Sequence, residues 1–115
     1  MTSRVSAALA AAIILVVAGQ GAARAGEHGI ASSYPYSYKG RRTASGEALD
    51  PHAMTCAHRR YPFGSTLRVT AGEKSITCRV TDRGPFVRGR VIDLTPAAAH
   101  ALGLTGLAHV SVERM

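Results

Sequence analysis

Two carboxylates on predicted loops are the residues best suited to acid–base chemistry in this sequence. Asp82 lies in TDRGPF at residues 81–86, after an alternating run at 75–80 and before a β-branched run at 87–94. This order predicts two strands joined by a tight connection that carries the carboxylate. Gly84 permits backbone conformations closed to other residues and Pro85 fixes its own φ, so the turn should be stiff. The alternative is a plain Asp-Arg-Gly turn in which Asp82 binds its own backbone.

The second carboxylate, Glu47, ends TASGE at residues 43–47, where small and hydroxylated residues let a ligand approach the backbone. Cleavage of a glycosidic bond often uses two acids, one as proton donor and the other as base or charge stabiliser. Sequence spacing does not show whether Glu47 and Asp82 converge, and a lone loop glutamate is also typical of solvated surface. His58 ends the irregular segment 50–58, where it could orient a carboxylate or hold a buried loop in shape. Because no zinc-type ligand spacing is present, we expect no metal and no cofactor.

The first 25 residues have the features of a secretory signal peptide. Arg4 is followed by an apolar stretch at 5–18 that is too short for a comfortable membrane span, and ARA at 23–25 is a small-x-small cleavage site. Cleavage would leave 115 − 25 = 90 residues, a single domain at 26–115 with 14 − 2 = 12 basic against 7 acidic residues. We therefore expect a secreted, periplasmic protein without a stable membrane anchor. Its positive charge suits anionic envelope polymers better than nucleic acid.

Cys56 and Cys78 both lie in the exported part of the chain. An even cysteine count without Cys-x-x-Cys spacing, in an oxidising compartment, favours a disulfide over metal or redox chemistry. Such a bridge would stabilise the fold by roughly 3 kcal/mol. The alternative is two buried free thiols.

The pattern of residues predicts an all-β domain with about six short strands and one helix. Strands are expected at 29–34, 65–70, 75–80, 90–94 and 108–113, with further alternation at Tyr36 and Tyr38. The runs 65–70 and 75–80 should form a hairpin. Thr95 is the expected N-cap of the helix, which Pro96 begins and Gly103 ends. Closure into a barrel would protect the edges of so small a sheet.

Motifs along nearly the whole of residues 26–115 resemble one known family. They read GIASSYP at 29–35, GRRTASGE at 40–47, TCAH at 55–58, YPFGS at 61–65, TDRGPF at 81–86 and GRVIDLT at 89–95. In this order they resemble the double-psi β-barrel domain of the rare lipoprotein A (RlpA) family of bacterial septal-ring lytic transglycosylases. Ser33 stands where the family pattern has tryptophan, and Pro35 where it has glycine.

The resemblance implies a six-stranded double-psi β-barrel and three catalytic residues, Asp82, Glu47 and His58. The implied reaction cleaves the β-1,4 bond between N-acetylmuramic acid and N-acetylglucosamine in peptidoglycan and leaves a 1,6-anhydro end. In this scheme Asp82 would carry the proton, Glu47 would stabilise charge or share the proton, and His58 would orient one of them. Asp93 is read as structural or substrate-contacting.

We also expect substrate contacts from Tyr34, Tyr38, Ser45 and Arg83, although tyrosines pack in scaffolds as readily as they bind sugars. The expected protein is a monomer acting on glycan strands, with no peptidoglycan-binding repeat after the barrel. The same fold also serves expansin-like proteins, so a non-catalytic wall-binding module is the alternative function.

Overall fold

The computed structural model describes residues 26–115, and the predicted signal peptide lies outside them. The described chain contains six strands, a short α-helix and one turn of 3-10 helix. In order these are β1 (Glu27–Ser33), η1 (Tyr36–Tyr38), β2 (Thr55–Ala57), β3 (Thr66–Ala71), β4 (Lys74–Asp82), β5 (Arg90–Leu94), α2 (Pro96–Ala101) and β6 (Ala108–Arg114). No helix among residues 26–115 is long and apolar enough to cross a bilayer.

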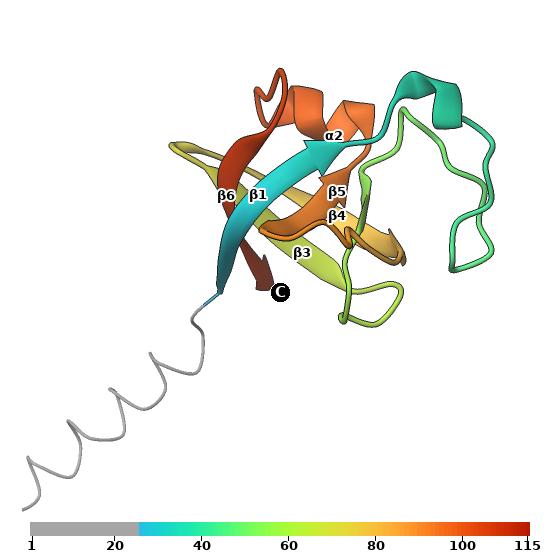
Figure 1. The fold of residues 1–115 in the computed structure, drawn as a ribbon, viewed down its shortest axis with the longest axis horizontal. Coiled ribbons are helices and arrows are strands. Elements are labelled where there is room, and N and C mark those ends of the chain that lie inside the picture. The colour runs from blue at the N-terminus through green and yellow to red at the C-terminus, as the bar shows by residue number, and fades with distance from the viewer. Residues whose placement is uncertain (1–25) are drawn as a thin grey trace, which may run out of the picture.

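The strands close into one barrel in the order β1-β5-β2-β4-β3-β6 (Figure 1). The pairs β1 with β5 and β2 with β4 are parallel, and the other four pairs are antiparallel. This mixed, six-stranded barrel with one helix agrees with the predicted all-β, double-psi class. The predicted hairpin is also confirmed, since β3 and β4 pair from Thr66 with Arg79 to Ala71 with Lys74.

The barrel interior is apolar because alternate residues of each strand face inward. Leu67 and Val69 of β3 are fully buried on either side of the exposed Arg68, and Val80 and Val112 are equally inaccessible. Cys56 on β2 and Cys78 on β4 form the predicted disulfide, with their Cα atoms 5.9 Å apart. The bridge therefore ties two neighbouring strands inside the core.

One strand was missed by the sequence prediction. Residues 50–58 were expected to be irregular, yet 55–57 form β2, which is buried throughout. A strand buried on both faces shows no alternation, so the usual signal is lacking. β2 also lies between β4 and β5, so the two strands that flank Gly84 are not hydrogen-bonded to each other.

The α-helix begins and ends as predicted. The Thr95 hydroxyl accepts a hydrogen bond from the backbone N–H of Ala98, Pro96 is the first helical residue, and Gly103 follows with φ of 78°. A left-handed φ of this kind favours glycine after a helix. Residues 36–38, which were expected to alternate as an extended segment, instead form η1.

Candidate active site

Asp82, the last residue of β4, is held by three hydrogen-bond donors. The Tyr34 hydroxyl donates to Oδ2 at 2.7 Å, and the backbone N–H groups of Ala44 and Arg83 both donate to Oδ1 at 2.9 Å. The Arg83 bond is the local turn contact expected of an Asp-Arg-Gly sequence. The other two come from distant segments, so the carboxylate is fixed by the fold and not by its turn alone.

Asp93 on β5 belongs to the same row of residues as Asp82. Ala57 of β2 pairs with Asp82 on one side, directly after a register shift between Cys56 and Ala57, and with Asp93 on the other side. Residues paired in register across neighbouring strands face the same side of a sheet, and two strand spacings amount to about 10 Å between Cα atoms. The fully buried Ala57 contributes only a methyl group between the two acids. The two carboxyl groups are therefore presented together.

The surroundings of Asp93 favour its protonated form. Burial is the main cause that raises its pKa above the ordinary value, and the nearby Asp82 carboxylate acts in the same direction. The Ser32 hydroxyl, which donates to Oδ1, and the Arg90 charge lower the pKa but do not outweigh burial. Sequence reasoning treated Asp93 as structural or substrate-contacting. The signal that could have pointed to proton chemistry is a lone acid within the apolar strand VIDL.

Tyr34 connects the two acids to the end of β1. Burial, the hydrogen bond to Asp82 and the charges of Asp82 and Asp93 all raise the pKa of its phenol. Tyr34 therefore remains a protonated donor to Asp82. Its hydroxyl serves the carboxylate, whereas the sequence predicted a contact with substrate.

Glu47 has a different environment from the aspartates. Both of its carboxylate oxygens accept from the Arg79 guanidinium, at 2.9 Å and 3.1 Å. This side chain is about half exposed, and the hydrogen bond from Arg79 lowers its pKa. No hydrogen bond joins Glu47 to Asp82 within residues 26–115. The two are linked through the backbone, because the turn that ends at Glu47 supplies the Ala44 N–H to Asp82.

His58 is fully buried and its ring is committed to other partners. Its Nδ1 accepts from the backbone N–H groups of Arg60 and Tyr61, at 3.1 Å and 3.2 Å. Its Nε2 lies 2.7 Å from Oε1 of Glu27, and the ring stacks on Tyr61 with centroids 4.2 Å apart. Among the described residues, the His58 side chain therefore makes no hydrogen bond to Asp82 or Glu47, and its role in orienting either of them stays a prediction. Only its backbone N–H reaches Asp82, at the carbonyl oxygen.

The remaining predicted contact residues are also occupied within the fold. The Arg83 guanidinium donates to the carbonyl oxygens of His58 and Tyr61 and lies over the Phe63 ring at 4.0 Å. It thus braces a loop instead of facing solvent. Arg41 covers the ring of Tyr38 at 3.8 Å. The Ser45 hydroxyl lies 3.0 Å from that of Thr43 and donates to Glu47.

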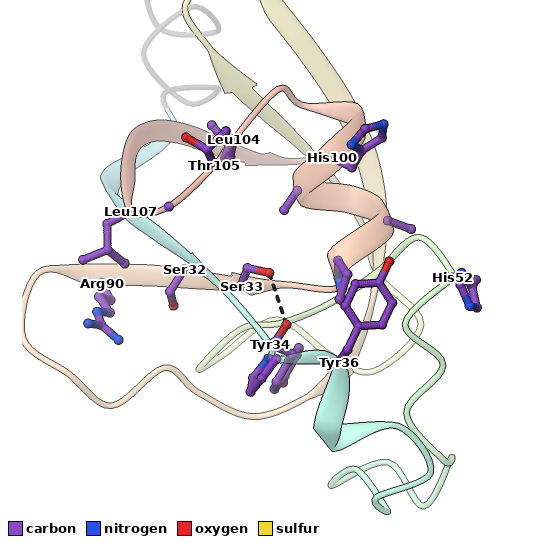
Figure 2. A pocket seen from close by; sticks show the side chains of 15 residues that line it. Ser32, Ser33, Tyr34, Tyr36, His52, Arg90, His100, Leu104, Thr105 and Leu107 are labelled. Atoms are coloured by element: carbon purple, nitrogen blue, oxygen red, sulfur yellow. Dashed lines mark hydrogen bonds between the residues drawn. The ribbon is translucent and has the colours of Figure 1, made fainter.

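A cavity of about 770 Å³ adjoins the residues that hold the two aspartates. Its wall includes Ser32 and Tyr34, the partners of Asp93 and Asp82. Figure 2 shows Tyr36 and His52 on one side of this cavity and Arg90 on the other. Among residues 26–115, no acidic side chain lines it. The cavity is therefore open, mixed in polarity and suited to a ligand that carries negative charge.

Within residues 26–115, no group of three histidine, cysteine, aspartate or glutamate side chains is placed to hold a metal ion. The arrangement that the described chain does offer is one carboxyl group whose pKa is raised by burial, in the same row as a second carboxyl group that is held by three donors. Such a pair can donate a proton and stabilise positive charge within one site.

The mixed six-stranded barrel places the chain in the double-psi β-barrel class. A sequence model of the lytic transglycolase family matches residues 26–113, and the chain belongs to this family of RlpA-like domains. The expansin of Clavibacter michiganensis has the same fold, with a TM-score of 0.62 and 24% identity over 78% of this chain and 50% of that one.

Two curated relatives show the extent of the sequence similarity. The probable endolytic peptidoglycan transglycosylase RlpA of a Nostoc species is 50% identical over 91 residues, which are 74% of this chain and 24% of that protein. The endolytic peptidoglycan transglycosylase RlpA of Pasteurella multocida is 45% identical over 89 residues, covering 74% of this chain and 30% of the relative. The chain thus spans between about a quarter and a third of the length of these relatives.

Proposed function

We propose that this protein is a peptidoglycan lytic transglycosylase that acts in the bacterial envelope, outside the cytoplasm. It would cleave the β-1,4 bond between N-acetylmuramic acid and N-acetylglucosamine, and the muramic C6 hydroxyl would take the place of water. The observation that carries the proposal is the row formed by Asp82, Ala57 and Asp93. The relatives named as endolytic transglycosylases support the choice of substrate.

Asp93 is the proton donor in this proposal. A general acid must hold its proton near the working pH, and burial raises the pKa of Asp93 in that direction. Its proton passes to the glycosidic oxygen as the bond from that oxygen to C1 breaks. The C6 hydroxyl then bonds to C1 and returns its proton to Asp93. The carboxyl group ends the cycle as it began, and no water is consumed.

Asp82 stabilises the positive charge that develops at C1. Three donors hold its carboxylate before substrate arrives, so little reorganisation is needed during the reaction. This division of roles revises the expectation that Asp82 carries the proton. Its basis is the contrast between a carboxylate with three donors and a half-buried acid whose only hydrogen-bond donor among the described residues is Ser32.

Glu47 and His58 are positioning residues in this proposal. Arg79 fixes Glu47 and with it the turn whose Ala44 N–H holds Asp82. His58 fixes the neighbouring loop through Glu27 and through the backbone N–H groups that its ring accepts. Their replacement would disturb catalysis through Asp82, without the loss of a group that touches the reacting atoms.

The cavity beside Tyr34 would bind part of the glycan strand. It contains Arg90, His52 and His100 but no acid, which suits the lactyl carboxylates of muramic residues from which the stem peptides have been removed. We propose that Tyr36, whose side chain is 62% exposed, contacts the strand there. The protein would do so as a monomer.

Mass spectrometry of the products tests the proposal. Purified protein is incubated with peptide-stripped glycan strands, alongside Asp82→Asn and Asp93→Asn. Fragments with anhydro ends, lighter by one water than hydrolysed ends, are expected from the wild type and from neither variant. Hydrolysed ends would instead indicate a glycosidase. Intact strands that still retain the protein would indicate a non-catalytic, expansin-like wall-binding module.

A further inference from the structure

The loop between β4 and β5 carries the most exposed aromatic ring of the described chain. The side chain of Phe86 is 79% exposed, compared with 62% for Tyr36 and 43% for Phe63, which Arg83 covers. A single exposed aromatic residue is ordinary on a protein surface. The position of Phe86 relative to Asp93 distinguishes it from such a residue.

Gly84 shows how close the ring and the acid are. A Cβ atom added to Gly84 would lie 3.6 Å from Cε2 of Phe86 and 3.7 Å from Oδ2 of Asp93. The ring and the carboxyl group therefore flank the same small opening, which the missing side chain of Gly84 leaves free. Gly84 also has φ of 117°, a conformation that other residues rarely adopt.

The oxygen of Asp93 that faces this opening is the available one. Oδ1 accepts the hydrogen bond from Ser32, whereas Oδ2 is the atom near Gly84 and Phe86. A sugar that lies on the Phe86 ring would thus present its linkage to the oxygen that exchanges the proton.

The two residues that precede the ring are buried, and the ring itself is left uncovered. Gly84 and Pro85 are buried, while Phe86, Val87 and Arg88 are exposed. The apolar C–H face of a pyranose ring can pack on the negative face of an aromatic ring. Arg88 adds a positive charge two residues away, where a lactyl carboxylate of the strand could approach.

We propose that Phe86 is a stacking platform for one sugar ring of the glycan strand, next to the bond that Asp93 protonates. This inference rests on the proposed function of the site, because it takes the glycan strand as the ligand. It also supplies an aromatic contact that the chain, which has Ser33 in place of the family's tryptophan, lacks at its first motif.

The protein contains no tryptophan, which permits a direct test. Phe86→Trp would introduce the sole tryptophan, and an Asp93→Asn background keeps the strands intact during titration. Stacking should shift or quench the emission as peptide-stripped strands are added. Glu73→Trp is the matched control, since Glu73 is exposed at the far end of β4, roughly 25–30 Å from Asp82 at 3.3 Å per residue. Its emission should not respond.

The kinetics of strand cleavage provide a second test of the Phe86 platform. Phe86→Ala should raise KM by about tenfold, the equivalent of one aromatic contact of about 1.4 kcal/mol, while kcat and thermal stability stay near those of the wild type. Phe86→Tyr should restore KM. An unchanged KM together with an unresponsive Phe86→Trp would overturn the platform and leave the transglycosylase standing.

The two proposals fail separately in these experiments. If wild-type protein yields no anhydro ends but the emission of Phe86→Trp responds to strands, the platform stands and the enzymatic function falls. If the wild-type protein does not cleave the strands and the emission of Phe86→Trp does not respond to them, both the enzymatic function and the stacking platform are overturned. Equal responses from Phe86→Trp and Glu73→Trp would show non-specific binding and likewise remove the platform.

Discussion

Five of the seven carboxylates of this small barrel fall into two kinds of region. Glu27, Glu47 and Glu113 each form a salt bridge with an arginine, and Glu27 also binds the buried His58. Asp82 and Asp93 form no salt bridge within residues 26–115; hydroxyls and backbone N–H groups surround them instead. Glu27, Glu47 and Glu113 are thus neutralised by neighbouring cations. Among the described residues, no cation forms a salt bridge with the carboxyl group of Asp82 or Asp93, which leaves both groups available to a ligand.

Under the proposed function, this difference separates structural from reactive carboxylates among these five better than position on a loop does. Glu47, selected by the sequence as a catalytic loop acid, is exposed and paired with Arg79. Burial raises the pKa of Asp93, which lies in a strand, and this is the direction that acid catalysis needs. Among these five carboxylates, the presence of a salt bridge therefore distinguishes the three glutamates from the two aspartates. The type of element on which each residue lies does not.

Replacement of Asp93 by asparagine tests the comparison with the largest expected effect. The amide keeps the size of the side chain but cannot donate a catalytic proton, so the rate of formation of anhydro ends should fall by about 10²- to 10⁴-fold. Product formation is measured by mass spectrometry over time. Glu113→Gln, which alters an exposed salt bridge on β6, is the control and should cleave at the wild-type rate. Equal rates in Asp93→Asn and the wild type would exclude Asp93 as the acid.

Glu27 should show a different pattern, in which the main loss is in the stability of the fold. Nδ1 of His58 accepts two N–H groups, so the ring carries its proton on Nε2 and donates it to Glu27. Glu27→Ala would leave this buried donor unpaired, and we expect a loss of about 2 kcal/mol in the free energy of unfolding. Urea denaturation measures the loss.

Glu27→Gln retains an acceptor for His58 and should recover most of that stability. Glu113→Ala, at an exposed pair with Arg68, should cost less than about 1 kcal/mol. A loss in Glu27→Ala no greater than that in Glu113→Ala would show that the buried pair is not structural.

The sequence predicted the hairpin, the helix and the disulfide because each has a local signal. Alternation defined the strands on either side of Gly72, and Thr95 with Pro96 marked the start of the helix. The row of acids had no such signal. This row depends on β2, which shows no alternation of buried and exposed residues. Because β2 was not predicted, the sequence did not indicate that Asp82 and Asp93 pair with the same residue. The pairing of His58 with Glu27 was equally hidden, since 31 residues separate them in the chain.

The pH dependence of stability should also distinguish Asp93 from Glu47. Folding raises the pKa of Asp93, so its contribution to stability is fully present below the ordinary aspartate pKa and is lost as pH rises through the folded value. Asp93→Asn removes the cost of a buried charge and should raise Tm at neutral pH, and the gain should vanish in acid. Thermal melts across pH measure this difference.

The pH dependence of stability that Glu47 contributes has the opposite sign to that of Asp93. Its pKa is lowered by Arg79, so its contribution to stability is present above the ordinary glutamate pKa and is lost as pH falls. Glu47→Gln should therefore not raise Tm at neutral pH. A gain in Tm for Glu47→Gln as large as that for Asp93→Asn would contradict the distinction between reactive and structural carboxylates.

Tyr34→Phe is the mildest test, because it removes one of the three donors to Asp82 and leaves the ring. A net hydrogen bond of about 1 kcal/mol predicts a fivefold to tenfold fall in kcat, with little change in KM. Tyr38→Phe removes a hydroxyl from a ring that Arg41 covers, and it controls for the loss of a phenol. If Tyr34→Phe raises KM instead of lowering kcat, the phenol contacts substrate, as the sequence first predicted, and Asp82 does not depend on it.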